Sequence, residues 1–479
     1  MRIWIFGCLV LVFTPISQAQ YQASFLDSTA NGGELYGVAE GQQVGAGFTS
    51  SGTHAMLWTG SPGSQVDLHP ASAAQSYAYG AGDGQQVGYS IISGNPKAML
   101  WTGSAASAVN LSPPGTTGSY AFATDGVHQV GSARTVSTLF RAVMWTGTTA
   151  SAVSLHPSLS YVTSMAEDLD GPYQVGYAAA SGHIYACVWT GSAASYQSID
   201  PPGATYSRAH AISGTQVVGE AGDFGAAGQH AVLWTGLSAA SAVSLKPLWL
   251  DGNDYAQGTN GTHQVGYGID AGGIHHAIVW QGTAASAVDL NAFLPPGATG
   301  AEAWAIDAAG NIVGSTYFGT LQRATIWRPA CFVSGTIVLE DFVGDVTGLP
   351  ILAELRNPGS GTVVDSQTLY LDASSHFALN AGLRGTYDLA FKAPHWLRSV
   401  VFSVNTTGAT ATANASLRNG DIDGDNEVGI GDYAILSVAY NSTEGDPNWA
   451  ANADLNGDLA VDIADYAVLS SNYGSVGDD

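Results

Sequence analysis

Basic residues are scarce in this chain of 479 residues. Lysine and arginine together number 13, against 38 aspartate and glutamate residues, so the formal net charge at pH 7 is −25. Nucleic acids and anionic membrane surfaces attract proteins that carry a basic face. The sequence therefore disfavours both as partners, and we expect no nucleic-acid binding and no membrane insertion.

Cysteine is scarce as well, with three residues in the whole chain. Cys187 occupies a repeat position that five of the six other copies fill with apolar residues, so we expect it to pack as a small hydrophobic side chain. Cys331 follows the last repeat. A disulfide between Cys187 and Cys331 stays open as an alternative, because sequence alone does not determine pairing.

Long apolar runs are missing too, and the longest one lies at the N-terminus. Arg2 supplies a positive charge, residues 3–13 form a short apolar stretch, and Ser17-Gln18-Ala19 has the small-x-small pattern of a cleavage site. The stretch falls short of the roughly 18 residues that a membrane-spanning helix needs. We expect a signal peptide at residues 1–19 and a secreted protein, extracellular or at the cell surface.

The main positive feature is a phrase that recurs seven times. Each copy has a Val-Gly pair, then a polar loop, then an apolar segment that ends in tryptophan and is usually followed by Thr-Gly. Successive tryptophans are 43 to 47 residues apart. A period of this size with several short strands per unit is typical of a β-propeller. The seven tryptophans are Trp58, Trp101, Trp145, Trp189, Trp234, Trp280 and Trp327.

The two ends of the repeat region predict how the ring closes. The seventh copy stops near Trp327 and lacks the Ala-Val-x-Leu strand that ends most other copies, while residues 21–26 form an extra strand ahead of the first copy. We expect that strand to replace the missing one, since closure removes exposed sheet edges. The sequence thus predicts a seven-bladed β-propeller over residues 20–331.

The repeat copies resemble the extracellular HAF-repeat family of bacterial secreted proteins, through pairs such as Val44-Gly45 followed by residues 54–58. The resemblance implies a propeller-like fold and assigns no activity. Sialidase boxes, His-Glu-x-x-His, Gly-x-Ser-x-Gly and phosphate loops are absent from the sequence. Recurring histidines at one repeat position, namely His54, His230 and His276, are expected to be structural parts of the blades.

Two functions remain open for the repeat region. The first is non-catalytic binding or display, with a glycan as ligand on the propeller face. The alternative is a carbohydrate-active enzyme, a glycoside hydrolase or lyase, which needs two carboxylates flanking one cleft. Acidic residues are scattered along the repeats: Asp67 and Asp289 share one strand position, and the acidic residues at 167–170 are expected between strands.

Residues 332–417 change pattern to a series of short strand candidates separated by turn signals. About six or seven strands are expected, with candidates at 333–339, 351–356, 368–371, 376–379, 387–391 and 400–404, which is typical of a small β-sandwich. The opening Val333-Ser334-Gly335-Thr336 and the run Gly385-Thr386-Tyr387-Asp388-Leu389 resemble carboxypeptidase-regulatory-like modules. That resemblance implies a non-catalytic spacer. We expect Trp396 to pack in a core.

The last part of the chain, residues 418–479, is acidic and duplicated. Two twelve-residue segments begin 33 residues apart, at Asp421 and Asp454. Oxygen-bearing side chains fall at positions 1, 3, 5 and 12 of each, the spacing that wraps oxygens around one calcium ion. Position 7 offers a backbone carbonyl. The predicted ligands of two Ca²⁺ sites are Asp421, Asp423, Asp425, Glu427 and Asp432, then Asp454, Asn456, Asp458, Ala460, Asp462 and Asp465.

Each loop leads into a matching helical segment, 432–437 and 465–470, and this duplicated arrangement resembles a type I dockerin. The resemblance implies calcium binding and a cohesin-like partner, contacted partly through positions 10 and 11, here Ile430-Gly431 and Ile463-Ala464. Position 6 departs from the calcium-loop pattern. It holds Asn426 in one loop and Leu459 in the other, where the sharp turn favours glycine.

Overall fold

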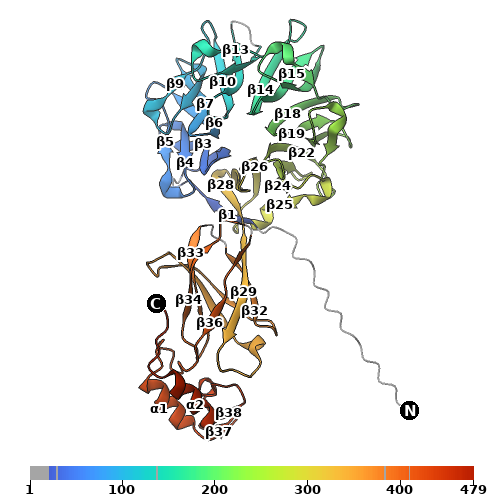
Figure 1. Cartoon of the computed structure of the whole chain (residues 1–479). Coiled ribbons are helices and arrows are strands. Elements are labelled where there is room, and N and C mark those ends of the chain that lie inside the picture. Colours follow the sequence, from blue (N-terminus) through green and yellow to red (C-terminus); the bar gives the residue numbers. More distant parts are fainter. Residues whose placement is uncertain (1–20, 28–30, 136–138, 382–384, 409) are drawn as a thin grey trace, which may run out of the picture. The chain divides into compact units, whose positions relative to one another are not determined.

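The computed structural model describes residues 21–27, 31–135, 139–381, 385–408 and 410–479. The predicted signal peptide lies outside these residues. The chain divides into two compact units, residues 21–328 and residues 329–479. Both are built mainly from β-strands, and the two α-helices of the described residues lie near the C-terminus (Figure 1).

The first unit consists of seven four-stranded sheets. Six of them use four strands that are consecutive in the chain, as the recurring phrase predicts. Their strands are β2 (Gly33–Ala39), β3 (Gln42–Thr49), β4 (Gly52–Trp58), β5 (Val66–Asp67); β6 (Gln75–Gly82), β7 (Gln85–Ile92), β8 (Asn95–Trp101), β9 (Val109–Asn110); β10 (Gly118–Thr124), β11 (Gln129–Arg134), β12 (Arg141–Trp145), β13 (Val153–Ser154); β14 (Thr163–Asp170), β15 (Tyr173–Ala180), β16 (His183–Trp189), β17 (Gln197–Ser198); β18 (Tyr206–Ser213), β19 (Gln216–Gly222), β20 (Gln229–Trp234), β21 (Ala242–Ser244); and β22 (Asn253–Thr259), β23 (Gln264–Ile269), β24 (His275–Trp280), β25 (Val288–Asp289).

The seventh sheet is completed by the N-terminal strand. Its order is β1 (Tyr21–Phe25), β28 (Leu321–Pro329), β27 (Ile312–Phe318) and β26 (Gly300–Ile306). The first strands of successive sheets contact one another all the way round, from β2 to β26 and back to β2. Figure 1 shows these strands on the inside of a propeller-like ring. The prediction that residues 21–26 replace the missing strand is confirmed.

Buried tryptophans and a repeated hydrogen bond hold each sheet in the ring. All seven anchor tryptophans are at most 1% exposed. In five sheets the glutamine that precedes Val-Gly accepts a hydrogen bond from a backbone amide. The donor is the glycine two residues after the anchor tryptophan, as when Gln86 Oε1 accepts from the Gly103 amide at 2.8 Å. The repeated sequence features are therefore mainly structural.

The Val-Gly glycine has a specific steric role. In every sheet the first strand contains a β-bulge, and this glycine on the second strand lies against it. A Cβ atom on Gly88 would lie 1.9 Å from the carbonyl oxygen of Tyr77, which is far inside van der Waals contact. Glycine is required here for close backbone approach, and the bulge that it permits turns one side chain inward.

The second unit begins with two packed sheets that share a buried core. Trp396 is fully buried in it, and its indole Nε1 donates to the Glu340 carbonyl at 3.2 Å. The strand expected at 368–371 instead spans Val363–Leu369. Two short strands, at 410–412 and 415–417, pair in parallel with the strand at 331–339 and were not predicted. The sheets are β31 (Val363–Leu369), β30 (Ile351–Arg356), β33 (Thr386–Lys392), β34 (Ser399–Asn405), and β32 (His376–Ala381), β29 (Cys331–Leu339), β35 (Thr410–Thr412), β36 (Ala415–Leu417).

The remainder of this unit contains α1 (Ile430–Ala439), α2 (Ile463–Asn472) and the small ladder β37 (Ser442–Thr443) with β38 (Ala460–Val461). Both helices begin two residues before the expected start. Among the described residues, no helix combines the length and apolar character that crossing a membrane requires. Cys187 and Cys331 are both buried, and the described residues contain no disulfide between them, so the structure does not support the open alternative.

Candidate functional site

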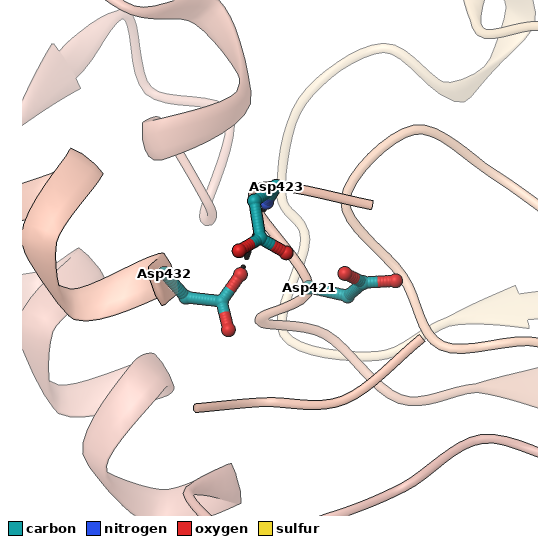
Figure 2. A group of neighbouring side chains, drawn as sticks. All are labelled: Asp421, Asp423 and Asp432. Atoms are coloured by element: carbon teal, nitrogen blue, oxygen red, sulfur yellow. Dashed lines mark hydrogen bonds between the residues drawn. The ribbon is translucent and has the colours of Figure 1, made fainter. Parts of the chain in front are cut away.

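The first predicted calcium loop brings three carboxylates together. Asp421 and Asp423 come from the loop, and Asp432 comes from the first turn of α1 (Figure 2). One oxygen from each lies within 4.8 Å of the others. Asp421 and Asp432 are at most 1% exposed. Three converging carboxylates without an intervening cation repel one another, and a hard cation removes that repulsion.

Backbone amides orient these carboxylates. The Ile422 and Asp423 amides donate to Asp432 Oδ1 at 2.6 and 3.0 Å, and the Gly429 amide donates to Asp432 Oδ2 at 2.6 Å. In contrast, Asp421 Oδ1 is buried without a hydrogen-bond partner among the described residues. A buried carboxylate oxygen with no donor has the character of a metal ligand. The residues present therefore fit calcium.

The electrostatics of the loop agree with this fit. Partial burial raises the pKa of Asp423, and the negative charges of Asp432, Asp425 and Asp421 raise it further, against one backbone hydrogen bond that lowers it. A bound divalent cation would reverse this shift, because it stabilises the ionised form of every neighbouring carboxylate.

The second loop reproduces the hydrogen bonds of the first. The Leu455 and Asn456 amides donate to Asp465 Oδ1 at 2.7 and 3.1 Å, and the Asp462 amide donates to Asp465 Oδ2 at 2.8 Å. Burial raises the pKa of both Asp454 and Asp465. The duplication seen in the sequence is thus also a duplication of local structure.

Position 6 adopts the strained conformation that the sequence predicts. The φ angles are 72° at Asn426 and 67° at Leu459. A left-handed backbone is tolerated by asparagine and is unfavourable for leucine. The Leu459 amide nevertheless donates to Asp454 Oδ2 at 2.9 Å, as the Asn426 amide does to Asp421 Oδ2 at 3.1 Å. The second loop keeps its register and carries a conformational cost.

The remaining predicted ligands occupy defined places around the loops. The side chains of Asp425 and Asp458 accept hydrogen bonds from the amides two residues ahead, at 2.9 and 3.0 Å. The Asp462 carboxylate caps α2 by accepting from the Ala464 amide at 2.7 Å. Asn456 accepts from the Asp458 amide at 2.9 Å. Glu427 forms a backbone bridge to Val476, and Ala460 begins β38.

Both helix starts expose apolar side chains. Ile430 is 72% exposed and Ile463 is 64% exposed, and these are the two residues at loop position 10. Tyr433 and Tyr466, one turn further on, contact each other with ring centroids 6.2 Å apart. Paired, exposed apolar residues on a duplicated element are typical of a protein interaction surface.

The calcium loop is also attached to the β-sandwich. Lys392, the last residue of β33, places its Nζ 2.6 Å from Asp421 Oδ2. The Asn419 side chain donates to the backbone carbonyls of Glu340 and Leu455 at 3.1 and 2.7 Å. This attachment was not predicted, because nothing in the sequence near Lys392 links it to a loop 29 residues later.

A second candidate site is the central cavity of the first unit. Its wider part has a volume of about 580 Å³, within the range of small-molecule sites. One bulged residue from each of the seven first strands lines it, which places seven different side chains around one axis. These residues are Tyr36, Tyr79, Phe122, Glu167, His210, Gln257 and Trp304.

One side of this cavity is aromatic. The Tyr36 ring lies 5.1 Å from the Tyr79 ring and 6.2 Å from the Trp304 ring, and Tyr79 lies 5.8 Å from Phe122 between centroids. The four rings form a continuous arc over neighbouring sheets. Sequence reasoning missed this arc, although each member stands eight or nine residues ahead of the valine of its Val-Gly pair, at a position where the copies differ.

The other side carries a charged cluster. His210 Nδ1 lies 2.6 Å from Glu167 Oε2, and His210 Nε2 lies 4.0 Å from Glu220 Oε2. Burial alone would lower the pKa of His210, but the two carboxylates outweigh it and raise that pKa to about 10. Burial likewise opposes ionisation of Glu220, yet His210 and Arg208 lower its pKa. His210 is therefore a cation at neutral pH.

Residues 167–170 belong to β14, which corrects the expectation that they lie between strands. Glu167 points to the cavity, whereas burial raises the pKa of Asp168 to about 7 and its carboxylate accepts from the Ile212 amide at 2.8 Å. The recurring histidines instead form pairs within a sheet or between neighbouring sheets. They are His54 with Asp67, His230 with Asp254 and His276 with Asp289, each at 2.8 Å.

Residues 419–472 match the family model of the Dockerin type I domain. Domains of that family bind calcium, and the acidic group of Asp421, Asp423 and Asp432 fits this. The match covers the duplicated loops and both helices, so the dockerin resemblance seen in the sequence is supported. No curated protein matches the chain.

Several solved structures are similar to parts of the chain. A type II cohesin-X-dockerin complex from Acetivibrio cellulolyticus matches at 21% identity and a TM-score of 0.26, over 31% of this chain and 97% of that one. Oligogalacturonate lyase from Vibrio parahaemolyticus matches at 10% identity and 0.44, over 65% and 94%. TolB from Acinetobacter baumannii matches at 11% identity and 0.35, over 53% and 62%.

Proposed function

We propose that the protein is a secreted binding or display protein that docks onto a cohesin-like partner through residues 418–479. The observation that carries this proposal is the Dockerin type I match over a duplicated pair of acidic loops. The exposure of Ile430 and Ile463 at the same position of the two loops supports it, since an apolar pair of this kind suits a protein interface.

Two calcium ions would hold the loops in the docking conformation. Calcium would supply the central positive charge around which the carboxylate and carbonyl oxygens of each loop are arranged. Asp421, Asp423 and Asp432 are the residues of the first loop best placed to bind it. Asp454, Asn456 and Asp465 are their counterparts in the second loop. A ligand at 100 times its dissociation constant stabilises the folded state by about 2.7 kcal/mol.

Calorimetry of the full chain tests the metal sites. Calcium titration should give binding heat corresponding to two sites, and Asp432→Ala and Asp465→Ala should each remove one. Asp345→Ala is the matched control, because Asp345 is an exposed acidic side chain that caps a short turn in the sandwich. Absence of calcium heat in the unaltered chain would refute the assignment.

Binding to a panel of purified cohesin modules tests the docking surface. Ile430→Asp and Ile463→Asp together should abolish calcium-dependent binding, because each places a charge in an apolar contact. Leu248→Asp is the control, since Leu248 is 93% exposed in the first unit. If the double variant binds as well as the unaltered chain, the helix starts are not the docking surface.

We further propose a three-part architecture for the mature chain. Residues 20–331 would form a seven-bladed β-propeller of the HAF-repeat type, residues 332–417 a carboxypeptidase-regulatory-like β-sandwich, and residues 418–479 the dockerin-like module, after a signal peptide at 1–19. Seven four-stranded sheets whose first strands contact one another in a closed circuit support the propeller.

The propeller would present a non-catalytic binding face, with a glycan as the candidate ligand. A second candidate is a carbohydrate-active enzyme, and one observation favours it. Glu34 and Glu302 both line the wider cavity, and burial raises the pKa of Glu34, which is the environment of a general acid. A polysaccharide-degradation screen separates the two candidates. Activity that disappears in both Glu34→Gln and Glu302→Gln would establish the enzyme.

A further inference from the structure

The most informative differences between the repeat copies are in residue type at the bulged position of the first strand of each sheet. Positions that recur in the copies, such as the tryptophan and the Val-Gly pair, have structural roles in every sheet. The bulged position points into the cavity and holds six residue types in its seven copies. When a repeat keeps its structural residues and varies one inward-facing position, the side chains at that position serve ligand contact rather than packing.

The variation is not random around the axis. Tyr36 and Trp304 belong to β2 and β26, the first and last sheets, which are neighbours in the ring. Two residues before each aromatic residue, on the same face of the strand, stands a glutamate, namely Glu34 or Glu302. Both glutamates line the wider part of the cavity. Two carboxylates and two aromatic rings therefore share one sector.

These two carboxylates are close enough to affect each other. Burial raises the pKa of Glu34, the Tyr36 hydroxyl that donates to it lowers that pKa, and the charge of Glu302 raises it again. Glu302 Oε1 accepts from His275 Nδ1 at 2.6 Å. Within the described residues, Glu34 forms no ion pair with a basic side chain. The sector thus has an excess of negative charge.

The opposite sector is already neutralised. The charge of Glu167 is matched by His210, and that of Glu220 by His210 and Arg208, whose Nη1 lies 3.7 Å from Glu220 Oε1. Residues 21–328 as a whole contain 18 aspartate and glutamate residues against 7 lysine and arginine residues. An anionic ligand would meet repulsion both at a distance and inside the cavity.

We propose that the sector formed by Glu34, Tyr36, Glu302 and Trp304 binds an organic cation, as an ammonium or quaternary ammonium group. The faces of tryptophan and tyrosine attract such a cation through the negative face of the ring, and the attraction grows when water is excluded. The two carboxylates supply the countercharge. This inference concerns the first unit and is independent of calcium and of docking.

The ammonium group can belong to a free quaternary amine, to an alkyl amine or to an amino sugar, and the experiment separates these sources. Calorimetry of the full chain in low-salt buffer at neutral pH uses choline, cadaverine and glucosamine as probes. Glucose and N-acetylglucosamine are the neutral partners of glucosamine, and galacturonate is the anionic one. At least one cation should bind, and the neutral and anionic sugars should bind at least about 10-fold more weakly, a difference of about 1.4 kcal/mol.

Matched variants locate the site. Glu34→Gln and Glu302→Gln keep the shape of the side chain and remove its charge, so each should weaken binding of the cation by about 10-fold, a change of about 1.4 kcal/mol. Glu40→Gln makes the same change at the exposed end of the β2–β3 hairpin and should have no effect. Trp304→Leu should also weaken binding, because it removes the aromatic face.

Three results would overturn the proposal. One is that no cation binds to the folded chain at millimolar concentration. Another is that glucosamine and glucose bind equally, which would make the cavity a neutral sugar site. The last is that binding survives in both glutamine variants while thermal melts show that they fold normally. Docking to cohesin modules, measured on the same preparations, is expected to be unchanged in all four variants.

Discussion

The glycine of each Val-Gly pair is the residue that allows the inner strand to bulge. We expect Gly88→Ala to destabilise the first unit by about 3 kcal/mol or more, because the new Cβ would lie 1.9 Å from the Tyr77 carbonyl oxygen and 2.9 Å from the Ala78 Cα. Backbone atoms on both sides leave no flexible group to move. Urea unfolding followed by tryptophan fluorescence measures the effect.

Gly63→Ala is the matched control for this change. A Cβ atom added at Gly63 would meet no heavy atom within 4 Å, and the φ angle of this residue lies outside the left-handed region. Its substitution should leave the unfolding midpoint within experimental error. Equal stability of the Gly88→Ala and Gly63→Ala proteins would mean that the bulge is not enforced by the glycine.

His210 gives the first unit a stability that depends on pH. Its folded pKa is about 10 against an ordinary value of 6.5, so its contribution is complete below pH 6.5 and is lost as the pH rises through 10. His210→Gln should cost about 3 kcal/mol near pH 6, since it leaves Glu167 without its cation and Glu220 with Arg208 alone. Unfolding midpoints of both proteins between pH 6 and 10 should converge. A constant difference would contradict the ion-pair role.

Single residues also show where sequence reasoning succeeds and where it stops. Spacing alone predicted that Asp421, Asp423 and Asp432 come together, because the ligands of a calcium loop lie within twelve residues of one another. Tyr36, His210 and Trp304 were missed as a set. They are far apart in the chain and become neighbours only through the ring, so their shared place ahead of a Val-Gly pair is the signal that connects them.

At the scale of elements, the N-terminal strand β1 closes the ring. The Leu26 amide donates to the Ala324 carbonyl at 2.8 Å, and Asp27, buried in the fold, forms an ion pair with Arg323 at 2.6 Å. Deleting residues 21–27 leaves β28 with an unpaired edge and Arg323 without its partner. We expect the melting temperature of the first unit to fall by at least about 5 °C and the protein to self-associate.

A peptide of residues 21–27 added to the truncated chain provides the check on this prediction. It should restore the melting temperature and the monomeric state, whereas a peptide of the same composition in scrambled order should not. An unchanged melting temperature after the deletion would show that β1 contributes little to closure.

The sequence was informative about elements where a pattern repeats and less so where strands occur once. The four strands of each ring sheet could be read from the recurring phrase, and the incomplete last copy pointed to β1. In the sandwich, β31 was placed several residues too late, and β35 and β36 were missed. Both are three residues long and pair in parallel with the distant strand β29, so their only signal is tertiary.

At the scale of the whole molecule, the β-sandwich and the calcium loops form a single compact unit. Asn419 connects the two parts by donating to the Glu340 and Leu455 carbonyls and by its hydrogen bond with His395 Nδ1 at 2.9 Å. Burial lowers the pKa of His395 to about 4, so this imidazole is neutral at physiological pH and the contact is a neutral hydrogen bond. Such contacts make the stability of one part depend on the other.

We therefore expect calcium to stabilise the sandwich as well as the loops. Lys392 Nζ holds Asp421 Oδ2 at 2.6 Å, and the Arg398 amide donates to Asn426 Oδ1 at 2.8 Å, so ordering the first loop restrains the ends of β33 and β34. Hydrogen exchange of the full chain should slow in both strands when calcium is added. Lys392→Met should remove this effect in β33 while calorimetry still detects calcium, and Lys97→Met, the same change in the other unit, should preserve it. If calcium slows hydrogen exchange only within residues 419–472, the sandwich and the loops are stabilised independently. The contacts between them would then not couple calcium binding to the stability of the sandwich.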